Sequence, residues 1–512
     1  STGTLTGYLN GVKFSTTGGV GRTYGHNPVE LGNISGERLH DNSTSNNNMP
    51  FYGVIDDVKV WDGVLLAGTI AAAYRDGWGL IGRWKLDEAG GTTAVDSSGI
   101  GNDGAYWNGA APAAGGPYSG AGARAAAFNG SSQQIGVTSV ASYDTTDEAI
   151  SVAAWVRFNT ATADQTQQQY IIQRDNWGAK KGFVLMVDQP YSDSVLFRVY
   201  NGTTYADAAW TDSGILADEW HHLVGTFNGT TVNLYVDGEL KASTPFVATL
   251  APYATGNVTI GNQLAGRIFD ARLYNRALLN SEIARIYGLV GWWKLDDASG
   301  STAVDSSLAG KNGTYTGGVT LNQTGPKSGL SAAEFDGSDG HVALPTYYEG
   351  FGEGFSMSVW ANPTAANSWA RFLELSRGTD NNNLLLARDG TTADLAGVVR
   401  DGSLGGWRSV NASNAITNDA WHHYAVTVDS TGAAILYVDG TSVGSATIGT
   451  PSDVARTLNY IGRSVYSADA YYEGKMYDVR LFNRPMTVDE VATAYSAGRS
   501  LGVRIVKWIE IQ

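Results

Sequence analysis

An internal repeat constrains this chain more than any other feature. The stretch "AWHHYAVTVDSTGAAILYVDG" (420–440) has a counterpart, "EWHHLVGTFNGTTVNLYVDG" (219–238), about two hundred residues earlier. Other pairs follow in the same order, and their offset stays between 201 and 209 residues: 83–107 with 292–316, 125–137 with 332–344, 150–158 with 355–363, 258–262 with 458–463, and 269–288 with 477–498. The sequence therefore predicts two complete modules in tandem, at residues 80–288 and 289–498.

Part of a third copy precedes them. "LTGYLNGVKF" (5–14) corresponds to the strands around "LYVDG", and residues 54–77 correspond to the closing segment of a module. Residues 1–79 are thus expected to be the C-terminal half of a module. The last residues, 499–512, alternate between apolar and polar side chains, and we expect them to form a C-terminal strand that folds back.

Each module has the pattern of antiparallel strands. Dipeptides typical of two-residue hairpin turns separate runs of alternating apolar residues: Asn10-Gly11, Asp237-Gly238 and Asp439-Gly440. A helix is expected only at the end of each module, where Thr487 and Glu490 form a capping-box pattern. The predicted fold is all-β, with tandem antiparallel β-sandwiches and short helices at the module ends.

The composition agrees with this fold and excludes several function classes. The 512 residues suffice for two or three domains, and the many Gly (65), Trp (15) and Tyr (26) residues suit turn-rich β-structure. A net charge of −15 disfavours nucleic acid as a partner, and the absence of Cys excludes disulfides and thiolate chemistry. No apolar stretch is long enough to cross a membrane. Because the chain begins at Ser1 without Met, we expect either a removed leader or a piece of a longer polypeptide.

The order of short motifs adds a family resemblance. W-K-L-D, D-S-S, F-[ND]-G, W-H-H, Y-V-D-G, I-G and D-x-R-[LF]-[YF]-N-R, followed by a short helix, resemble the laminin-G-like modules of the concanavalin A-like lectin/glucanase superfamily. The resemblance covers nearly the whole chain and implies concanavalin A-like jelly rolls. Because this fold hosts lectins, glucanases, adhesive modules and spacers, the function has to be argued from a site.

The sequence does not predict an enzyme. The glucanases of the resembling superfamily carry a run close to Glu-x-Asp-x-x-Glu on one strand, which places paired carboxylates on one face. No such run occurs in this chain. The His pairs, His221-His222 and His422-His423, recur at equivalent positions beside a Trp, without metal-ligand spacing, so they are predicted to be structural.

The resemblance implies a calcium site in each module. In the family, a late-strand Asp often holds calcium together with acids from the first strand, and loop carbonyls such as those of "GNDG" (101–104) and "GKNG" (310–313) could complete the shell. The alternative is that the late-strand Asp pairs with the Arg two residues further on, Arg272 or Arg480. The predicted metal ligands are Asp57, Asp270, Asp478, Asp87, Glu88, Asp296 and Asp297.

Aromatic residues outside the repeated framework are candidates for a glycan site, because sugar rings stack on aromatic planes. The alternative is that they close the ends of the sandwich. The predicted ligand-binding residues are Trp177, Tyr191, Trp210, Trp369, Trp407, Tyr471 and Tyr472.

These observations predict a non-enzymatic, extracellular or surface-exposed protein that binds a glycan or surface glycoconjugate and is stabilised by calcium. The alternative is a structural assembly protein, such as a filament subunit or a virion fibre or decoration component. Half a sandwich exposes apolar surface and strand edges, so residues 1–79 need a partner. An upstream stretch of the same polypeptide would supply it in cis, and another copy of the chain would supply it in trans.

Overall fold

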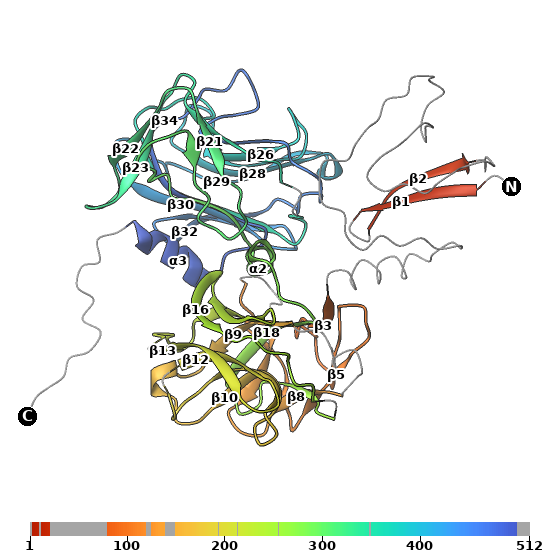
Figure 1. Cartoon of the computed structure of the whole chain (residues 1–512). Coiled ribbons are helices and arrows are strands. Elements are labelled where there is room, and N and C mark those ends of the chain that lie inside the picture. Colours follow the sequence, from red (N-terminus) through yellow and green to blue (C-terminus); the bar gives the residue numbers. More distant parts are fainter. Residues whose placement is uncertain are drawn as a thin grey trace, which may run out of the picture.

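The computed structural model of the protein describes residues 3–9, 12–20, 79–118, 124–138, 149–192, 194–211, 213–253, 255–347 and 350–498. Two β-sandwich modules pack directly against each other (Figure 1). The first runs from β3 (Leu80–Trp84) to α2 (Asn280–Tyr287), and the second from β19 (Leu289–Trp293) to α3 (Val488–Ala497). This confirms the predicted all-β fold with short helices at the module ends.

The first module consists of two antiparallel sheets. Its distal sheet faces away from the second module and has the strand order β13-β12-β11-β10-β17-β8-β5-β4. These strands are β4 (Thr93–Ala94), β5 (Gly104–Trp107), β8 (Gln134–Val137), β10 (Gln169–Asn176), β11 (Lys181–Val187), β12 (Ser194–Tyr200), β13 (Tyr205–Thr211) and β17 (Val258–Ile260).

The junction sheet of the first module faces the second module. Its order is β16-β15-β14-β9-β18-β7-β6, and β3 also pairs with β18. The strands are β6 (Ala111–Ala114), β7 (Arg124–Asn129), β9 (Ile150–Phe158), β14 (Trp220–Phe227), β15 (Thr231–Val236), β16 (Glu239–Pro245) and β18 (Ala265–Tyr274), with a short 3-10 turn, η2 (Thr162–Asp164), after β9.

The second module repeats this topology. Its junction sheet has the order β22-β23-β34-β25-β30-β31-β32 with β19 on β34, and its distal sheet has the order β20-β21-β24-β33-β26-β27-β28-β29. The strands are β20 (Thr302–Ala303), β21 (Gly313–Thr316), β22 (Val319–Thr324), β23 (Ser331–Asp336), β24 (His341–Leu344), β25 (Phe355–Pro363), β26 (Arg371–Ser376), β27 (Asn383–Arg388), β28 (Leu395–Asp401), β29 (Gly406–Ala412), β30 (His422–Val428), β31 (Ala433–Val438), β32 (Thr441–Thr447), β33 (Leu458–Ile461) and β34 (Glu473–Phe482), with a 3-10 turn, η3 (Gly402–Leu404).

Near the N-terminus, β1 (Gly3–Leu9) and β2 (Val12–Val20) pair antiparallel, with Leu9 opposite Val12. Apart from these two strands and Gly79, residues 1–79 lie outside the described residues, and this includes Asn10-Gly11 and Asp57. The tail 499–512 also lies outside them. The predictions of an incomplete module and a C-terminal strand therefore remain predictions.

Strict alternation along the strands builds each core. On β11, Phe183, Leu185 and Val187 join the core between the two sheets, while Val184 and Met186 belong to a separate apolar cluster on the opposite face. Successive side chains of a strand point to opposite faces, so both groups arise from one short run. The distal sheet thus carries an apolar floor on its outer face as well.

The repeated W-H-H and Y-V-D-G motifs form one structural unit. Asp237 and Gly238 both adopt positive φ, 51° and 77°, as a two-residue hairpin turn requires. The Asp237 carboxylate accepts a hydrogen bond from the backbone N–H of His222 (2.8 Å) and lies 2.7 Å from Nδ1 of His221. Asp439 makes the same contacts with the second His pair, at 2.9 Å each. The turn and the strand beside it therefore depend on each other, which confirms the structural role predicted for the His pairs.

The second His of each pair packs in an aromatic cluster. His222 lies 5.2 Å from the ring of Trp155 and stacks on Tyr287 at 5.8 Å (centroid distances). Burial lowers the pKa of His222 to about 3 and that of His423 to about 4. Both rings are therefore neutral in the folded protein at neutral pH.

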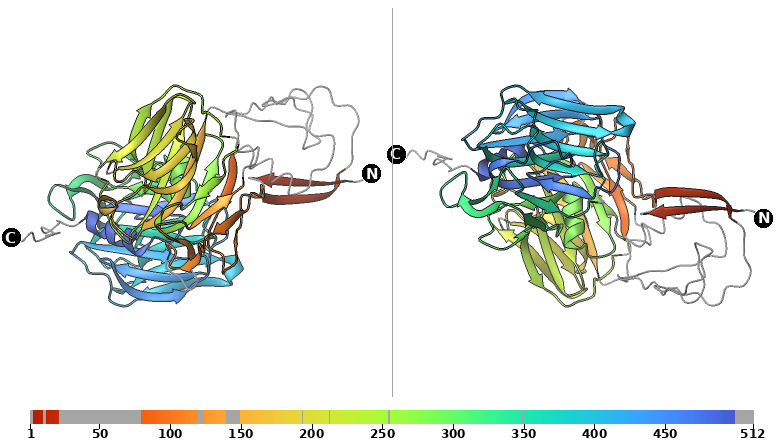
Figure 2. Two further views of the ribbon diagram at one scale, coloured as in Figure 1. Left: turned by 90° about the horizontal axis from the view of Figure 1, so that it is seen from below. Right: turned by 90° about the horizontal axis from the view of Figure 1, so that it is seen from above.

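No linker separates the modules. Helix α2 ends at Tyr287, and Gly288 takes the left-handed conformation (φ 100°) that lets β19 begin at the next residue. Both helices lie between the modules in Figure 1, and Figure 2 shows the modules packed directly against each other from below and above. A shared apolar cluster fills the junction, with members from both junction sheets and from α3: Ala125, Trp155, Trp220, Tyr287, Leu289, Ala425, Tyr437, Phe482, Met486, Val491 and Ala494.

Arg484 lies at the centre of this cluster. Its guanidinium group forms two hydrogen bonds with Glu490 (2.6 and 2.7 Å) and donates from Nε to the carbonyl oxygen of Tyr287. The same group lies over the rings of Trp155 (4.6 Å), Tyr287 (4.9 Å) and Phe482 (5.0 Å). Tyr287 completes the network by donating from its hydroxyl to Glu490 (2.9 Å). A residue of the first module is thus bound by an ion pair of the second.

We expect Arg484→Ala to reduce the free energy of unfolding by ~3–5 kcal/mol, because it leaves the Glu490 carboxylate unpaired in a largely buried site. Arg276 is a matched control, since it forms the same two-bond pair with Glu282 (2.6 Å each) in the first module, with its side chain 26% exposed against 8% for Arg484. Arg276→Ala should cost less, because the Arg276 guanidinium group is more exposed, although Glu282 (12% exposed) is as buried as Glu490 (14%). Urea unfolding of both variants measures this, and equal losses would contradict the role of Arg484 at the junction.

Buried His423 predicts a pH dependence. Its pKa is lower in the folded protein, about 4, than the ordinary 6.5, so its stabilising contribution is complete above pH 6.5 and decreases as the pH falls toward 4. At pH 5 this loss is ~2 kcal/mol relative to pH 7. We expect His423→Asn to reduce the difference between the unfolding free energies at pH 7 and pH 5 by this amount. An unchanged difference would show that His423 does not carry the effect.

Candidate functional site

The candidate site is a groove on the outer face of the distal sheet of the first module. It has a volume of about 500 Å³ and runs along β11 between the loops at the two ends of that strand. The residues that line it are Gln168, Tyr170, Asp175, Trp177, Val184, Met186, Asp188, Tyr191, Arg198, Tyr200 and Tyr205. The groove therefore brings together two of the predicted ligand-binding residues, Trp177 and Tyr191.

Trp177 marks one end of the groove. Its side chain is 51% exposed, and its ring contacts the ring of Tyr205 at a centroid distance of 5.2 Å. Lys180 places its Nζ 3.3 Å from the centroid of the indole ring. Nearby, Arg198 is held by two hydrogen bonds to Asp207, at 2.6 and 2.7 Å. An aromatic plane with anchored polar neighbours is thus presented to solvent.

Tyr191 marks the other end and is 80% exposed. The floor beside it is polar, because Gln168 donates to Asp188 (2.6 Å) and accepts from the Tyr170 hydroxyl (2.7 Å). Burial also raises the pKa of Asp175, whose carboxylate accepts from a tyrosine hydroxyl in the groove. The groove therefore combines aromatic rings with hydrogen-bond donors and acceptors along its length.

The second module has aromatic side chains at the same end of its distal sheet. Trp407 is 44% exposed, and its ring lies 5.8 Å from the ring of Tyr466. Asp380 accepts hydrogen bonds from the indole N–H (3.2 Å) and from the Tyr466 hydroxyl (3.0 Å), and it forms an ion pair with Arg400 (3.2 Å). The sequence prediction found Trp407 and missed Tyr466 and Asp380.

A change in the repeat offset could have identified Tyr466. The offset is 201 between Ile260 and Ile461 and 208 between Asp270 and Asp478, so the second module carries seven additional residues in this loop. These residues place Tyr466 beside Trp407. The aromatic pair of the second module is therefore built differently from the groove of the first.

The other predicted aromatic residues do not join these sites. Trp210 is half-buried against the core with Lys241 near its ring, and Trp369 lies beside Arg371. Tyr471 contacts the ring of His341. Tyr472 is 1% exposed and packs in the core against Phe335 and Phe372, so the prediction that it contacts a ligand is wrong.

The structure does not assemble the predicted calcium ligands. Asp270 forms ion pairs with Arg83 (2.7 Å) and Arg272, and these cations hold the pKa of its carboxyl, despite burial, well below the ordinary value. Asp478 pairs with Arg480 (2.8 Å) and accepts a hydrogen bond from the indole of Trp292. The alternative hypothesis, that each Asp pairs with the Arg two residues further on, is confirmed in both modules.

Two of the four predicted first-strand ligands, Glu88 and Asp297, are also engaged. Glu88 accepts hydrogen bonds from the Tyr106 hydroxyl and the Val95 N–H, at 2.8 Å each, and Asp297 accepts from the Tyr315 hydroxyl (2.8 Å). Asp87 and Asp296 are exposed. Across the part of the chain that the structure describes, no three His, Asp or Glu side chains converge on a point that could hold a metal ion. The predicted ligands among the described residues therefore do not come together at one point, and calcium binding stays a prediction.

The loop predicted to lend carbonyls to calcium instead surrounds a buried Asp. The carboxylate of Asp96 accepts from the N–H groups of Ser98 (2.8 Å), Gly101 (3.1 Å) and Asn102 (2.8 Å). The carbonyl oxygen of Asn102 accepts from the indole of Trp84 (2.9 Å). Asp305 has the same function in the second module. The recurring D-S-S motif was the signal for this arrangement.

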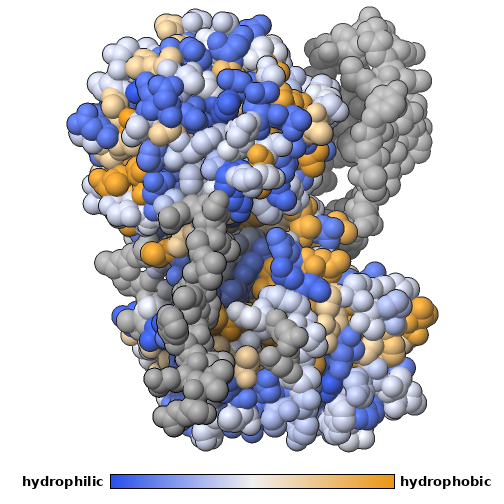
Figure 3. All heavy atoms as spheres, turned by 90° about the vertical axis from the view of Figure 1, so that its left-hand side faces the viewer, coloured by the Kyte–Doolittle hydropathy of each residue, from blue (hydrophilic) through white to orange (hydrophobic). Residues whose placement is uncertain are grey.

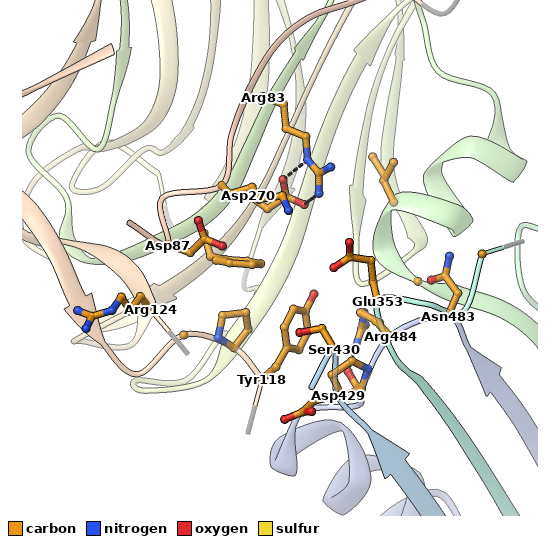
Figure 4. A pocket seen from close by; sticks show the side chains of 18 of the residues that line it. Arg83, Asp87, Tyr118, Arg124, Asp270, Glu353, Asp429, Ser430, Asn483 and Arg484 are labelled. Atoms are coloured by element: carbon orange, nitrogen blue, oxygen red, sulfur yellow. Dashed lines mark hydrogen bonds and ion pairs between the residues drawn. The ribbon is translucent and has the colours of Figure 1, made fainter. Parts of the chain in front are cut away.

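Two hollows lie between the modules. One, of about 450 Å³, is lined by residues of both modules, with the Asp270 ion pairs at one side (Figure 4). The other, of about 330 Å³, includes His221, Asp489 and residues of α3, and the surface is hollowed between the modules on the α3 side (Figure 3). Because the junction fixes the modules against each other, both hollows have walls from two sandwiches.

We expect calcium to leave the melting temperature unchanged, because arginine already neutralises Asp270 and Asp478. A calcium site occupied at 100 times its Kd would add about 2.7 kcal/mol of stability. Differential scanning fluorimetry with millimolar calcium, and then with chelator, measures this. A calcium-dependent increase that is lost in Asp270→Asn and Asp478→Asn would contradict the expectation and support the original ligand assignment.

Comparisons with known proteins agree with the fold. The sequence model of a family described as the concanavalin A-like lectin/glucanases superfamily matches residues 129–284 and 336–492, which together exceed half the chain. Across the described residues, no helix has the length and apolar character needed to cross a membrane.

Individual relatives share only part of their length with this chain. An alpha-L-arabinofuranosidase of Bifidobacterium longum is 23% identical over 209 residues, covering 38% of this chain and 20% of that protein. Human usherin is 32% identical over 102 residues, covering 18% of this chain and 2% of usherin. Domain 4 of AbnA, a GH43 extracellular arabinanase from Geobacillus stearothermophilus solved with arabinotriose, has 20% identity and a TM-score of 0.32, and covers 41% of this chain and 98% of that one.

Proposed function

The chain belongs to the concanavalin A-like lectin/glucanase superfamily, and from that premise we propose that it is a non-enzymatic glycan-binding or adhesive protein of the extracellular space or a cell surface. The groove along β11 is its binding site. The partner is a polysaccharide or glycoconjugate, a class of ligand that is abundant outside cells.

One observation carries the proposal: the groove has exposed aromatic rings at both ends, and both polar and apolar side chains line it between them. Trp177 and Tyr191 are exposed at the two ends, and Gln168, Asp188 and Arg198 place hydrogen-bonding groups along the groove between them. Saccharides need both, because their C–H faces pack on aromatic rings and their hydroxyls form hydrogen bonds. The seven residues of β11 span ~23 Å, which suits several sugar units in a row better than a single one.

Binding without hydrolysis is supported by the absence of a Glu-x-Asp-x-x-Glu run from the sequence. The carboxylates of the groove also have hydrogen-bond partners, Asp188 through Gln168 and Asp175 through Tyr200. The match to the arabinofuranosidase makes arabinan fragments a useful probe.

The alternative of an assembly protein depends on residues 1–79 and 499–512, which are described only at β1, β2 and Gly79. It therefore stays a prediction, and its test is the oligomeric state of the chain in solution. Calcium is not part of the proposal, because arginine side chains hold Asp270 and Asp478, and tyrosine hydroxyls bind Glu88 and Asp297.

We expect Trp177→Ala to weaken saccharide binding by about 30-fold, since removal of a dominant aromatic contact costs about 2 kcal/mol. Isothermal titration calorimetry with arabinotriose, xylotriose, cellotriose, chitotriose and sialyllactose measures this. Val247→Ala is the control, because Val247 is 85% exposed and does not line the groove. Trp407→Ala separates a contribution of the second module.

Unchanged affinity in Trp177→Ala, with a melting temperature equal to that of the wild type, would exclude the groove as the site. A folded protein that binds none of the five saccharides would contradict the proposed function.

A further inference from the structure

The cavity of about 450 Å³ at the junction is built from both modules. The first contributes Arg83, Asp87, Tyr118, Phe269 and Asp270, and the second contributes Gly350, Glu353, Asp429, Asn483 and Arg484, among others. The shared apolar cluster and the Arg484 network hold its two walls together. Side chains of both modules therefore line this space (Figure 4).

The repeat provides an internal comparison for the cavity residues. Arg83 has Trp292 as its counterpart in the second module, Tyr118 has Lys327, and Arg285 has Thr493. The framework of the sandwich therefore does not require Arg83, Tyr118 or Arg285. All three line the cavity, so the first module differs from the second where it faces this space.

Polar groups from both walls converge on the cavity. Arg83 and Asp270 form one side, and the carboxylates of Asp87 and Glu353 and the hydroxyl of Tyr118 point toward the same space (Figure 4). Asp87 and Glu353 are exposed, and they form no ion pair with any described residue. Burial raises the pKa of the Tyr118 hydroxyl well above its ordinary value, so it remains a donor. Among the described residues, the carboxylates of Asp87 and Glu353 and the hydroxyl of Tyr118 are thus available as acceptors and donor.

An aromatic surface adjoins these polar groups. The rings of Tyr118 and Phe269 meet edge to face at a centroid distance of 5.6 Å, and Arg484 lies 5.6 Å from the Tyr118 ring. This combination of aromatic rings, carboxylate acceptors and a hydroxyl donor is similar in chemistry to the groove. It does not suit a metal ion, because the described acids do not cluster in threes.

We propose that the junction cavity is a second, composite saccharide site that takes a single sugar unit, with hydroxyls bound by Asp87 and Glu353 and a ring face on Tyr118 and Phe269. The choice of saccharide as ligand class rests on the proposed function. The position of the site does not, because it follows from the cavity alone. The site belongs to the two modules together, so a ligand in it stabilises their junction.

The experiment measures the number of saccharides bound per full chain by calorimetry, with the same five saccharides. Wild type should bind two per chain. Asp87→Asn and Glu353→Gln should each remove one, since each replaces a carboxylate acceptor with an amide of similar shape. Asp296→Asn is the matched control, because Asp296 occupies the position of Asp87 in the second module and does not line the cavity. It should still bind two.

Combination with Trp177→Ala separates this inference from the proposed function. Trp177→Ala should keep one site of wild-type affinity and weaken the other, and Trp177→Ala with Asp87→Asn should keep no site of wild-type affinity. Two sites in both Asp87→Asn and Glu353→Gln, or loss of all binding in Trp177→Ala, would overturn the composite site and leave the groove in place. If the wild type binds one saccharide, and this binding is lost in Asp87→Asn but retained in Trp177→Ala, the groove is not a binding site and the cavity is. Binding of none of the five saccharides would overturn both.

Discussion

The structure depends on one buried ion pair, Arg484 with Glu490, which closes around the end of the first module. A buried guanidinium group is costly unless its donors are satisfied, and Arg484 meets this demand with Glu490, the carbonyl oxygen of Tyr287 and a shell of aromatic rings. The same pair caps α3, because Glu490 also accepts from the N–H of Thr487 (2.8 Å). The same interaction thus caps the last helix of the second module and holds the first module against it. The shape of the junction cavity follows from this arrangement.

The framework of the chain could be predicted from its sequence, because the same motifs occur in the same order in both modules. The W-H-H and Y-V-D-G motifs predicted the hairpin, and the capping box at Thr487 and Glu490 formed as expected. The site was predicted only in part. Trp177 and Tyr191 line the same groove, but Tyr472 lies in the core, because the sequence around a loop Tyr does not indicate whether its side chain points inward or outward. Asp270 shows a second limit of prediction from sequence. A carboxylate two residues before an arginine can form an ion pair or bind a metal ion, and the sequence does not show that Arg83 lies beside Asp270 in the fold.

The differences between the modules carry the functional argument. Both distal sheets end in exposed aromatic side chains, but the first module uses Trp177 and Tyr205 where the second uses Trp407 and Tyr466 from a longer loop. The two modules share the same sheets, and the loops that differ between them place different aromatic side chains at the ends of those sheets. The junction cavity could not be foreseen from either module, because it requires their relative placement.

The central claim is that the two modules form one cooperative unit around the Arg484 network, and differential scanning calorimetry of the full chain tests it most directly. The account predicts a single transition for the two modules, with equal calorimetric and van't Hoff enthalpies, that shifts as a whole when a bound saccharide is added. Two separate transitions, of which only one responds to the saccharide, would contradict it.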